Sequence, residues 1–162
     1  LETTSSNTQF GHSFDNWGHH FLVTNSNHII QEILAATYLK RNPALVVADA
    51  TASLSDHGNA AEVFPITTNP ENQLLTDIGV ITSACGITIY QGNLFPAPYD
   101  QASFVAEPVS NLVHVDSRRE KGIGFVAGRI LPKKEFLASK DSWFRPVNMY
   151  VGPDGALYLV DY

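Results

Sequence analysis

The C-terminal segment, residues 143–162, constrains the fold more than any other part of the sequence, because it places a tight turn between two apolar runs. The turn is Gly152-Pro153-Asp154-Gly155, in which proline presets φ for the first corner and Asp-Gly supplies the positive φ that tight turns need. Residues 147–151 before the turn and 156–160 after it are rich in residues that favour strands. We therefore predict a β-hairpin whose inner strand leaves Asp161 at its end.

Similar units of short strands and turns occur elsewhere in the chain. Residues 14–18 (FDNWG) form a turn pattern, followed by strand-like runs over 20–25 and 28–34. Residues 103–116 (SFVAEPVSNLVHVD) have the pattern of a strand, a two-residue corner and a second strand. Repeated short strands joined by tight turns predict an all-β fold made of four-stranded antiparallel blades, as in a β-propeller. The chain contains material for about three blades.

Residues 37–82 form one long stretch with no regular strand pattern, which we interpret as an irregular insertion. Turn-forming groups such as Asn42-Pro43, Ser55-Asp56-His57-Gly58 and Asn69-Pro70-Glu71-Asn72 punctuate it. Loops of this length are usually functional or cover a neighbouring face. A short helix near 30–39 competes with a strand there, because Ile30, Ile33, Leu34 and Tyr38 have helical spacing. We favour a strand for the first half and leave the second half open.

Composition limits the classes of function. The 162 residues are 44% hydrophobic and carry a net charge of −6, which argues for a folded domain with a core and against a nucleic-acid partner. No apolar run approaches the roughly 20 residues that a membrane-spanning helix needs. Cys85 is the single cysteine, so an internal disulfide, a cysteine-rich zinc site and a haem-attachment motif are excluded within these residues.

Four blocks of sequence, in order, resemble one known family. They are residues 10–29 (FGHSFDNWGHHFLVTNSNHI), 81–96 (ITSACGITIYQGNLFP), 104–116 (FVAEPVSNLVHVD) and 143–162. Together they resemble the membrane-bound dehydrogenase-like β-propeller family, whose members are often fused to a c-type haem domain. This family is distantly similar to the soluble quinoprotein glucose and sorbosone dehydrogenases.

The resemblance implies that residues 1–162 belong to the second half of a single six-bladed propeller and are a fragment of a larger protein. The remaining blades, or a second chain, would complete the ring, because three blades leave unpaired edges. Any haem c would lie in a part of the parent outside this chain. The resemblance also implies a periplasmic or cell-envelope location.

The resemblance further implies pyrroloquinoline quinone and calcium as cofactors, with Arg145 as the cofactor-binding residue. Residues 144–147 (FRPV) match the family pattern of an aromatic residue, arginine and valine before a Pro-Asp-Gly turn, and a guanidinium can grip a carboxylate bidentately. Three positions depart from the pattern: a second arginine is Trp143, an expected lysine is missing from 108–111, and the calcium-binding Gly-Pro corner is residues 24–26 (TNS). The catalytic histidine and aspartate of such enzymes would lie upstream, so no catalytic residue is assigned here.

Two groups of polar residues are candidates for ligand binding at the mouth of the expected channel. Asn25, Asn27 and His28 follow the first long strand pattern, where amides and an imidazole could bind sugar hydroxyls or a metal, or could simply cap the corner. Glu107 and Asn111 belong to the later unit, and Glu107 could be a ligand, a general base or a buried partner of Arg145.

Other polar and aromatic residues are weaker candidates, and the sequence assigns no metal ligand. The Asp56-His57 pair could hold a metal or act in acid–base chemistry, although neighbouring side chains on extended backbone point apart. His114 has the pattern of a histidine packed within a strand, and Cys85 that of a buried, inert thiol. Trp17 and Trp143 are expected to pack in the core or between blades, or to stack on a sugar ring.

Two functions remain open from the sequence. The first is a quinoprotein-like oxidoreductase that oxidises a small-molecule sugar or alcohol and passes electrons to a haem domain. The second is a non-catalytic propeller that binds carbohydrate or a protein partner. Fold analogy does not decide between them.

Overall fold

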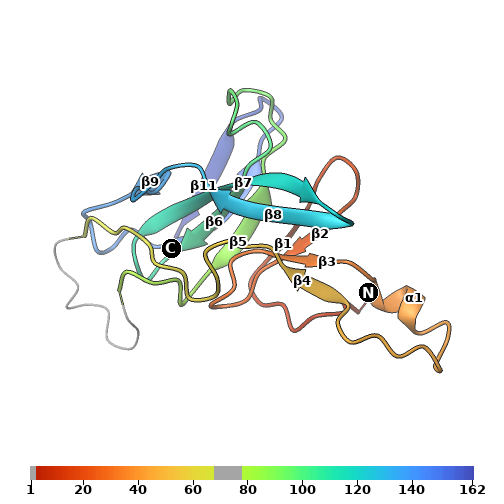
Figure 1. Cartoon of the computed structure of the whole chain (residues 1–162). Coiled ribbons are helices and arrows are strands. Elements are labelled where there is room, and N and C mark those ends of the chain that lie inside the picture. Colours follow the sequence, from red (N-terminus) through yellow and green to blue (C-terminus); the bar gives the residue numbers. More distant parts are fainter. Residues whose placement is uncertain (1–2, 68–77) are drawn as a thin grey trace.

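The computed structural model describes residues 3–67 and 78–162 and has an all-β architecture, as the sequence predicts (Figure 1). A first sheet has the strand order β1-β2-β3-β4, a second has the order β5-β6-β7-β8 with β9 paired to β7, and β10 and β11 form a two-stranded sheet. The pairs between named strands are antiparallel. The elements are β1 (His12–Phe14), β2 (His20–Leu22), β3 (Ile30–Glu32), α1 (Ala36–Leu39), β4 (Thr51–Ser53), β5 (Cys85–Ile89), β6 (Ser103–Glu107), β7 (Leu112–Lys121), β8 (Gly124–Arg129), β9 (Leu137–Ala138), β10 (Pro146–Val151) and β11 (Leu157–Asp161).

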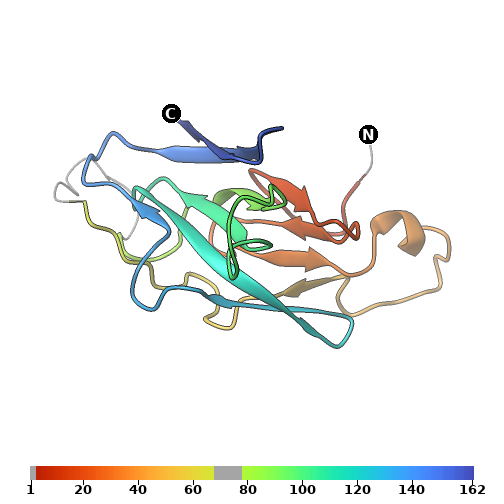
Figure 2. The same cartoon turned by 90° about the horizontal axis from the view of Figure 1, so that it is seen from above.

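The second sheet is the middle layer of the molecule, because its two faces belong to two different hydrophobic clusters. Leu112 of β7 packs with Phe21 of the first sheet, whereas Val113 and Val115 of β7 pack with Met149 of β10. Alternate residues of a strand point to opposite faces, so residues 112, 114 and 116 of β7 face the first sheet. The strand β5 contacts both β1 and β10, and Figure 2 shows the β10–β11 hairpin along one side of the molecule.

The C-terminal hairpin forms as the sequence predicts. The Gly155 N–H donates to the Gly152 carbonyl at 2.9 Å, and Gly155 has a φ of +82°, which glycine adopts without steric cost. The Tyr158 hydroxyl donates to Asp154 at 2.8 Å and fixes the turn from the strand side. The outer faces of the hairpin expose Tyr150, Tyr158 and Val160.

The unit at 103–116 also forms two strands, but its corner is longer than predicted. Glu107 pairs with Leu112, so residues 108–111 form a four-residue corner rather than a two-residue one. The corner needs the extra length because the Asn111 N–H returns to the Pro108 carbonyl at 3.4 Å and Asn111 adopts a φ of +54°. Asparagine tolerates this left-handed conformation better than most residues.

Residues 30–39 agree with the prediction, whereas residues 37–82 differ from it in one part. Residues 30–32 form β3 and residues 36–39 the short helix α1, so the strand occupies the first half as expected. The stretch 37–82 is not wholly irregular, because residues 51–53 form β4 by pairing with β3. The predicted turn at residues 69–72 lies outside the described residues.

The prediction that both tryptophans pack in the core or between blades is wrong for the described residues, whereas stacking on a sugar ring stays a prediction. The exposed fraction of Trp17 is 86% and that of Trp143 is 78%. Each belongs to a turn closed by an aspartate side chain: Asp15 accepts the Trp17 N–H at 3.0 Å and Asp141 accepts the Trp143 N–H at 2.9 Å. Such turns hold the backbone at the surface and leave the indole rings in solvent. No helix in residues 3–67 and 78–162 is long and apolar enough to cross a membrane.

The Gly155 position gives a test of the fold. We expect Gly155→Ala to lower the free energy of unfolding by about 2–4 kcal/mol, because φ is positive and a Cβ there would collide with the Gly92 carbonyl oxygen. Gly122→Ala is the matched control: φ is +63° but a Cβ there meets nothing within 4 Å, so we expect a loss of about 1 kcal/mol. Urea unfolding monitored by circular dichroism measures both values, and equal losses would contradict the described turn packing.

Candidate metal centre

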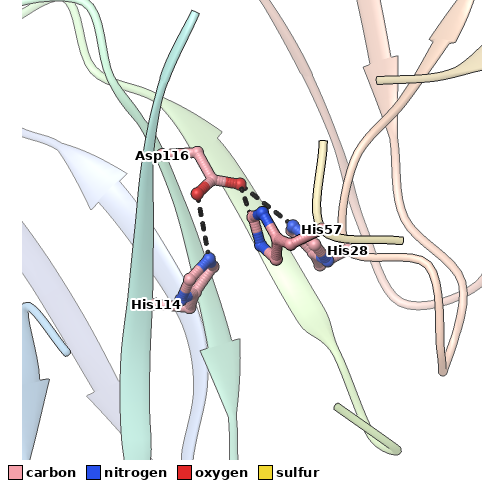
Figure 3. Close-up of side chains that lie close together, drawn as sticks. All are labelled: His28, His57, His114 and Asp116. Carbon is pink, nitrogen blue, oxygen red and sulfur yellow. Dashed lines mark hydrogen bonds and ion pairs between the residues drawn. The ribbon is translucent and has the colours of Figure 1, made fainter. Parts of the chain in front are cut away.

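Four side chains from three separate parts of the chain converge in the interface between the first and second sheets. They are His28, His57, His114 and Asp116 (Figure 3). Each offers one potential ligand atom, and these atoms all lie within 4.8 Å of one another. Three of the four residues are buried, and the exposed fraction of the His57 side chain is only 17%.

Two members of the cluster lie on one strand. His114 and Asp116 belong to β7 and are separated by one residue, so both point to the face that covers the first sheet. Hydrogen bonding of β7 to β6 on one side and to β8 on the other fixes their register: Val105 pairs with His114 and Arg129 with Asp116. The strand pairing of the middle sheet therefore fixes the positions of His114 and Asp116.

The corner between β2 and β3 positions His28. The Thr24 N–H donates to the Asn27 carbonyl at 2.9 Å, and the Asn27 N–H donates to the Thr24 hydroxyl at 3.2 Å. The Asn27 side-chain amide donates to Ser53 of β4 at 3.1 Å. The corner therefore has a fixed shape and directs His28 inward.

The segment that follows β4 brings His57 to the cluster by leaving the first sheet and pairing with the second. Ser55 forms a parallel bridge with Ala127 of β8, and the Asp56 N–H donates to the Ala127 carbonyl at 2.9 Å. A Cβ at Gly128 would lie 2.7 Å from Asp56 Oδ2, so the glycine makes room for this crossing. The two sheets are thus joined by backbone hydrogen bonds next to the cluster.

Asp116 is the hub of the cluster. Its Oδ2 accepts from His28 Nε2 at 2.9 Å and its Oδ1 from His114 Nε2 at 3.0 Å, and the carboxylate is fully buried. Burial acts to raise the pKa of Asp116, but the hydrogen bonds from His114 and His28 hold this pKa well below its usual range. His57 Nε2 lies 3.9 Å from Asp116 Oδ2, too far for a hydrogen bond.

Acidic side chains hold the far nitrogens of two of the histidines. Glu135 Oε2 accepts from His114 Nδ1 at 2.7 Å, and Asp56 Oδ1 accepts from His57 Nδ1 at 2.9 Å. Glu135 is itself held by the Phe64 N–H at 3.1 Å and by Arg129 at 3.5 Å. A carboxylate behind a histidine fixes the ring and directs its other nitrogen, which is the usual second shell of a metal site.

The pKa values of His114 and His28 shift in opposite directions. Burial acts to lower the pKa of His114, but the hydrogen bonds that His114 donates to Asp116 and Glu135 raise this pKa to about 9. Burial lowers the pKa of His28, and its single hydrogen bond to Asp116 does not offset this effect. In the absence of an ion, His114 is therefore a cationic ring held between two carboxylates.

The residues predicted as ligands do not form one site. Only His28 belongs to the cluster. Asn27 is a structural residue of the corner, and Asn111 donates to the Phe144 carbonyl at 2.6 Å, tying the second sheet to the segment before β10. Asn25 is exposed and lines a separate pocket of about 380 Å³ with Ser83, Cys85, Pro108 and Val147.

Glu107 is buried beside that pocket. Its Oε2 accepts from the N–H groups of Ser83 at 2.9 Å and Thr82 at 3.2 Å, so its partners are backbone amides rather than Arg145. Arg145 is half-buried, and its backbone N–H donates to Asp161 at 2.6 Å. Cys85 is buried, and burial raises the pKa of its thiol to about 12, as expected for an inert cysteine.

The corner at residues 24–26 does not fit the calcium cradle that the resemblance implies. The Asn25 carbonyl accepts from the Ala84 N–H at 3.0 Å, and the Ser26 carbonyl accepts from the Ala60 N–H at 2.8 Å. These oxygens already hold backbone donors, and Trp143 at the expected second arginine position is exposed. We therefore assign no quinone or calcium ligand at this corner.

Sequence reasoning found half of the cluster, because His28 and His57 were both named as possible metal-binding residues. His114 was expected to pack within a strand, and Asp116 and Glu135 were not singled out at all. One local signal was present: the spacing His114-x-Asp116 on a strand places both side chains on one face. The approach of His57 depends on the pairing of residue 55 with residue 127, and no local pattern predicts a contact over that separation.

Glu107 gives a pH-dependent prediction. Burial raises the pKa of Glu107 from 4.5 to about 7, so between these values the folded protein holds a proton that the unfolded chain releases. Stability should therefore fall as the pH rises from 4.5 to 7. We expect Glu107→Gln to remove about 3 kcal/mol of this pH dependence. Urea unfolding of both proteins at pH 5 and pH 8 measures it, and parallel pH profiles would contradict the burial of an ionisable group.

Comparisons with known proteins place the chain in a family. No curated protein and no solved structure gives a significant match. A family model described as a domain of unknown function (DUF7133) matches residues 1–162, which is the whole chain. The chain therefore belongs to the DUF7133 family.

Proposed function

We propose that this domain binds one divalent transition-metal ion through His28, His57, His114 and Asp116, and that the ion fastens the first sheet to the second. The observation that carries the proposal is the state of His57: its Nε2 is buried, has no hydrogen bond among the described residues, and faces Asp116 at 3.9 Å. An unpaired nitrogen in such a place costs about 1–3 kcal/mol. A shared ion would satisfy it.

Zinc fits the ligand set best. Imidazole and carboxylate are both ordinary zinc ligands, and four protein ligands without an open position are typical of structural zinc sites. A tetrahedral ion with bonds of about 2.0–2.1 Å places its ligand atoms about 3.3 Å apart. The cluster spans up to 4.8 Å, so closing around zinc shortens the longest separation by about 1.5 Å. His57 can supply this shift, because it lies in a turn rather than in a strand.

The competing explanation is a metal-free network of buried ion pairs. A protonated His114 between Asp116 and Glu135 would be such a network. It leaves His57 Nε2 unexplained, and buried ion pairs are often no more stabilising than apolar residues of the same size. Measurement of bound metal separates the two explanations directly.

The arrangement of the strands supports a wider proposal that the sheets are successive blades of a propeller. Strands β1–β4, β5–β8 and β10–β11 follow one another in sequence order, and the first strand of the second sheet, β5, contacts the first strands of the other two, β1 and β10. In this proposal the metal lies between two blades.

The parent would be a dehydrogenase-like protein acting on a sugar or alcohol, with the haem outside this chain, or a non-catalytic binding propeller. A quinone absorption band in the intact parent would favour the dehydrogenase, and a colourless carbohydrate-binding protein the alternative.

Metal binding is tested on the purified chain. We expect chelator-treated protein to take up zinc and to unfold at a higher temperature with zinc present, because an ion bound only by the folded state stabilises it. His57→Gln and Asp116→Asn should each remove the part of this thermal shift that the buried cluster supplies. His19→Gln is the matched control, because His19 is also a histidine paired with an aspartate, Asp15, at 2.8 Å, but lies outside the cluster.

Differential scanning calorimetry with and without zinc gives the shift. An equal shift in wild type and in His57→Gln would overturn the proposal. His57→Gln also separates binding from folding, because residue 57 is partly exposed in a turn and its substitution leaves the strands intact.

The supporting carboxylates give a graded prediction. We expect Asp56→Asn and Glu135→Gln each to weaken zinc binding about 10–100-fold, because each replaces the charged acceptor behind a ligand histidine with a weaker, neutral one. Competition with a chelating dye of known affinity measures the change. Asp100→Asn, which changes an exposed aspartate, should leave the affinity as it is.

A further inference from the structure

Two further histidines, outside the buried cluster, lie side by side on the first sheet. His12 belongs to β1 and His20 to the neighbouring strand β2, and Phe14 pairs with His20 across the two strands. His12 is two residues from Phe14, so both histidines point to the same face of the sheet. His12 Nδ1 and His20 Nε2 lie 3.1 Å apart.

Glu32 of β3 orients His20. Glu32 Oε2 accepts from His20 Nδ1 at 2.8 Å, and Glu32 Oε1 accepts from the Ser5 N–H at 2.6 Å. Because His20 Nδ1 donates to Glu32, the other ring nitrogen, Nε2, is directed toward His12 Nδ1. The Phe14 ring stacks on the His20 ring at 4.4 Å between centroids and holds it in place.

The separation of the two nitrogens matches a shared ion. Two nitrogens bound to one ion at about 2.0–2.1 Å lie about 2.9 Å apart at a right angle and about 3.3 Å apart in a tetrahedron. The observed 3.1 Å falls between these values. A carboxylate behind one of the two histidines, here Glu32, is the same second-shell device that Asp56 and Glu135 form at the buried cluster.

The site opens into a pocket, unlike the buried cluster. The pocket has a volume of about 720 Å³ and is lined by His12, His20, Glu32, Phe14 and Tyr38 among others. Phe14 and Tyr38 are exposed. An ion held by two protein nitrogens would keep its other coordination positions for water or for a small ligand in this pocket.

We propose that His12 and His20 form a second, solvent-open site for a late divalent transition-metal ion. Two imidazoles suit Cu²⁺, Ni²⁺ and Zn²⁺, and Cu²⁺ is expected to bind most tightly of the three. This site shares no residue with the buried cluster and does not depend on the function proposed for that cluster.

The test is a titration of the chelator-treated chain with Cu²⁺, followed by isothermal calorimetry and electron paramagnetic resonance. We expect two ions per wild-type chain if both proposals hold. His12→Gln and His20→Gln should each lose one ion and the signal of the open site. Glu32→Gln should keep the stoichiometry but weaken the open site about 10–100-fold. His12 is exposed, so its replacement leaves the fold intact, which circular dichroism verifies.

The variants distinguish the two proposals. His57→Gln should retain the ion that His12→Gln loses, so an ion lost only by His12→Gln and His20→Gln supports the open site even if the buried cluster binds nothing. His19→Gln is the control for ordinary surface binding, since His19 adjoins His20 and also pairs with a carboxylate. Unchanged binding in His12→Gln, or an equal loss in His19→Gln, would overturn the proposal.

Discussion

The structure depends on the buried carboxylate of Asp116, which joins two histidines from different sheets. It accepts from His114 on its own strand at 3.0 Å and from His28 at the edge of the first sheet at 2.9 Å. A buried carboxylate is expensive unless it is paired, so the two sheets must dock in the one arrangement that supplies both partners. Apolar contacts between the sheets supply attraction but little orientation. The polar cluster therefore selects the register of the interface.

A metal ion would strengthen this selection. The first sheet has strands of only three residues, and such short strands are weakly stable on their own. An ion shared by His28, His57 and the two β7 residues would link the first sheet, the crossing segment and the middle sheet at one point. The open pair His12 and His20 lies on the same sheet but joins only neighbouring strands, so its role would be to present an ion to the pocket rather than to hold layers together.

Sequence reasoning succeeds where the determinants are local. The β10–β11 hairpin is encoded by Gly152-Pro153-Asp154-Gly155, and β6 and β7 by two runs of strand-forming residues around a polar corner. It fails where the determinant is a contact between distant segments. The alternation of Val113, His114, Val115 and Asp116 marks a strand buried on both faces, but which histidines Asp116 meets depends on the docking of residues 28 and 57. Likewise, the large apolar rings of Trp17 and Trp143 predict packing in the core or between blades. Instead, both residues lie at the surface in turns that an aspartate side chain closes.

The most direct test of the central claim is X-ray absorption spectroscopy at the zinc edge. The sample is the His12→Gln variant loaded with one equivalent of zinc, so that only the buried cluster is occupied. The account predicts four nitrogen or oxygen ligands at about 2.0–2.1 Å with the outer-shell scattering of three imidazole rings. A shell of six oxygens without imidazole scattering, or zinc that washes away on gel filtration, would contradict it.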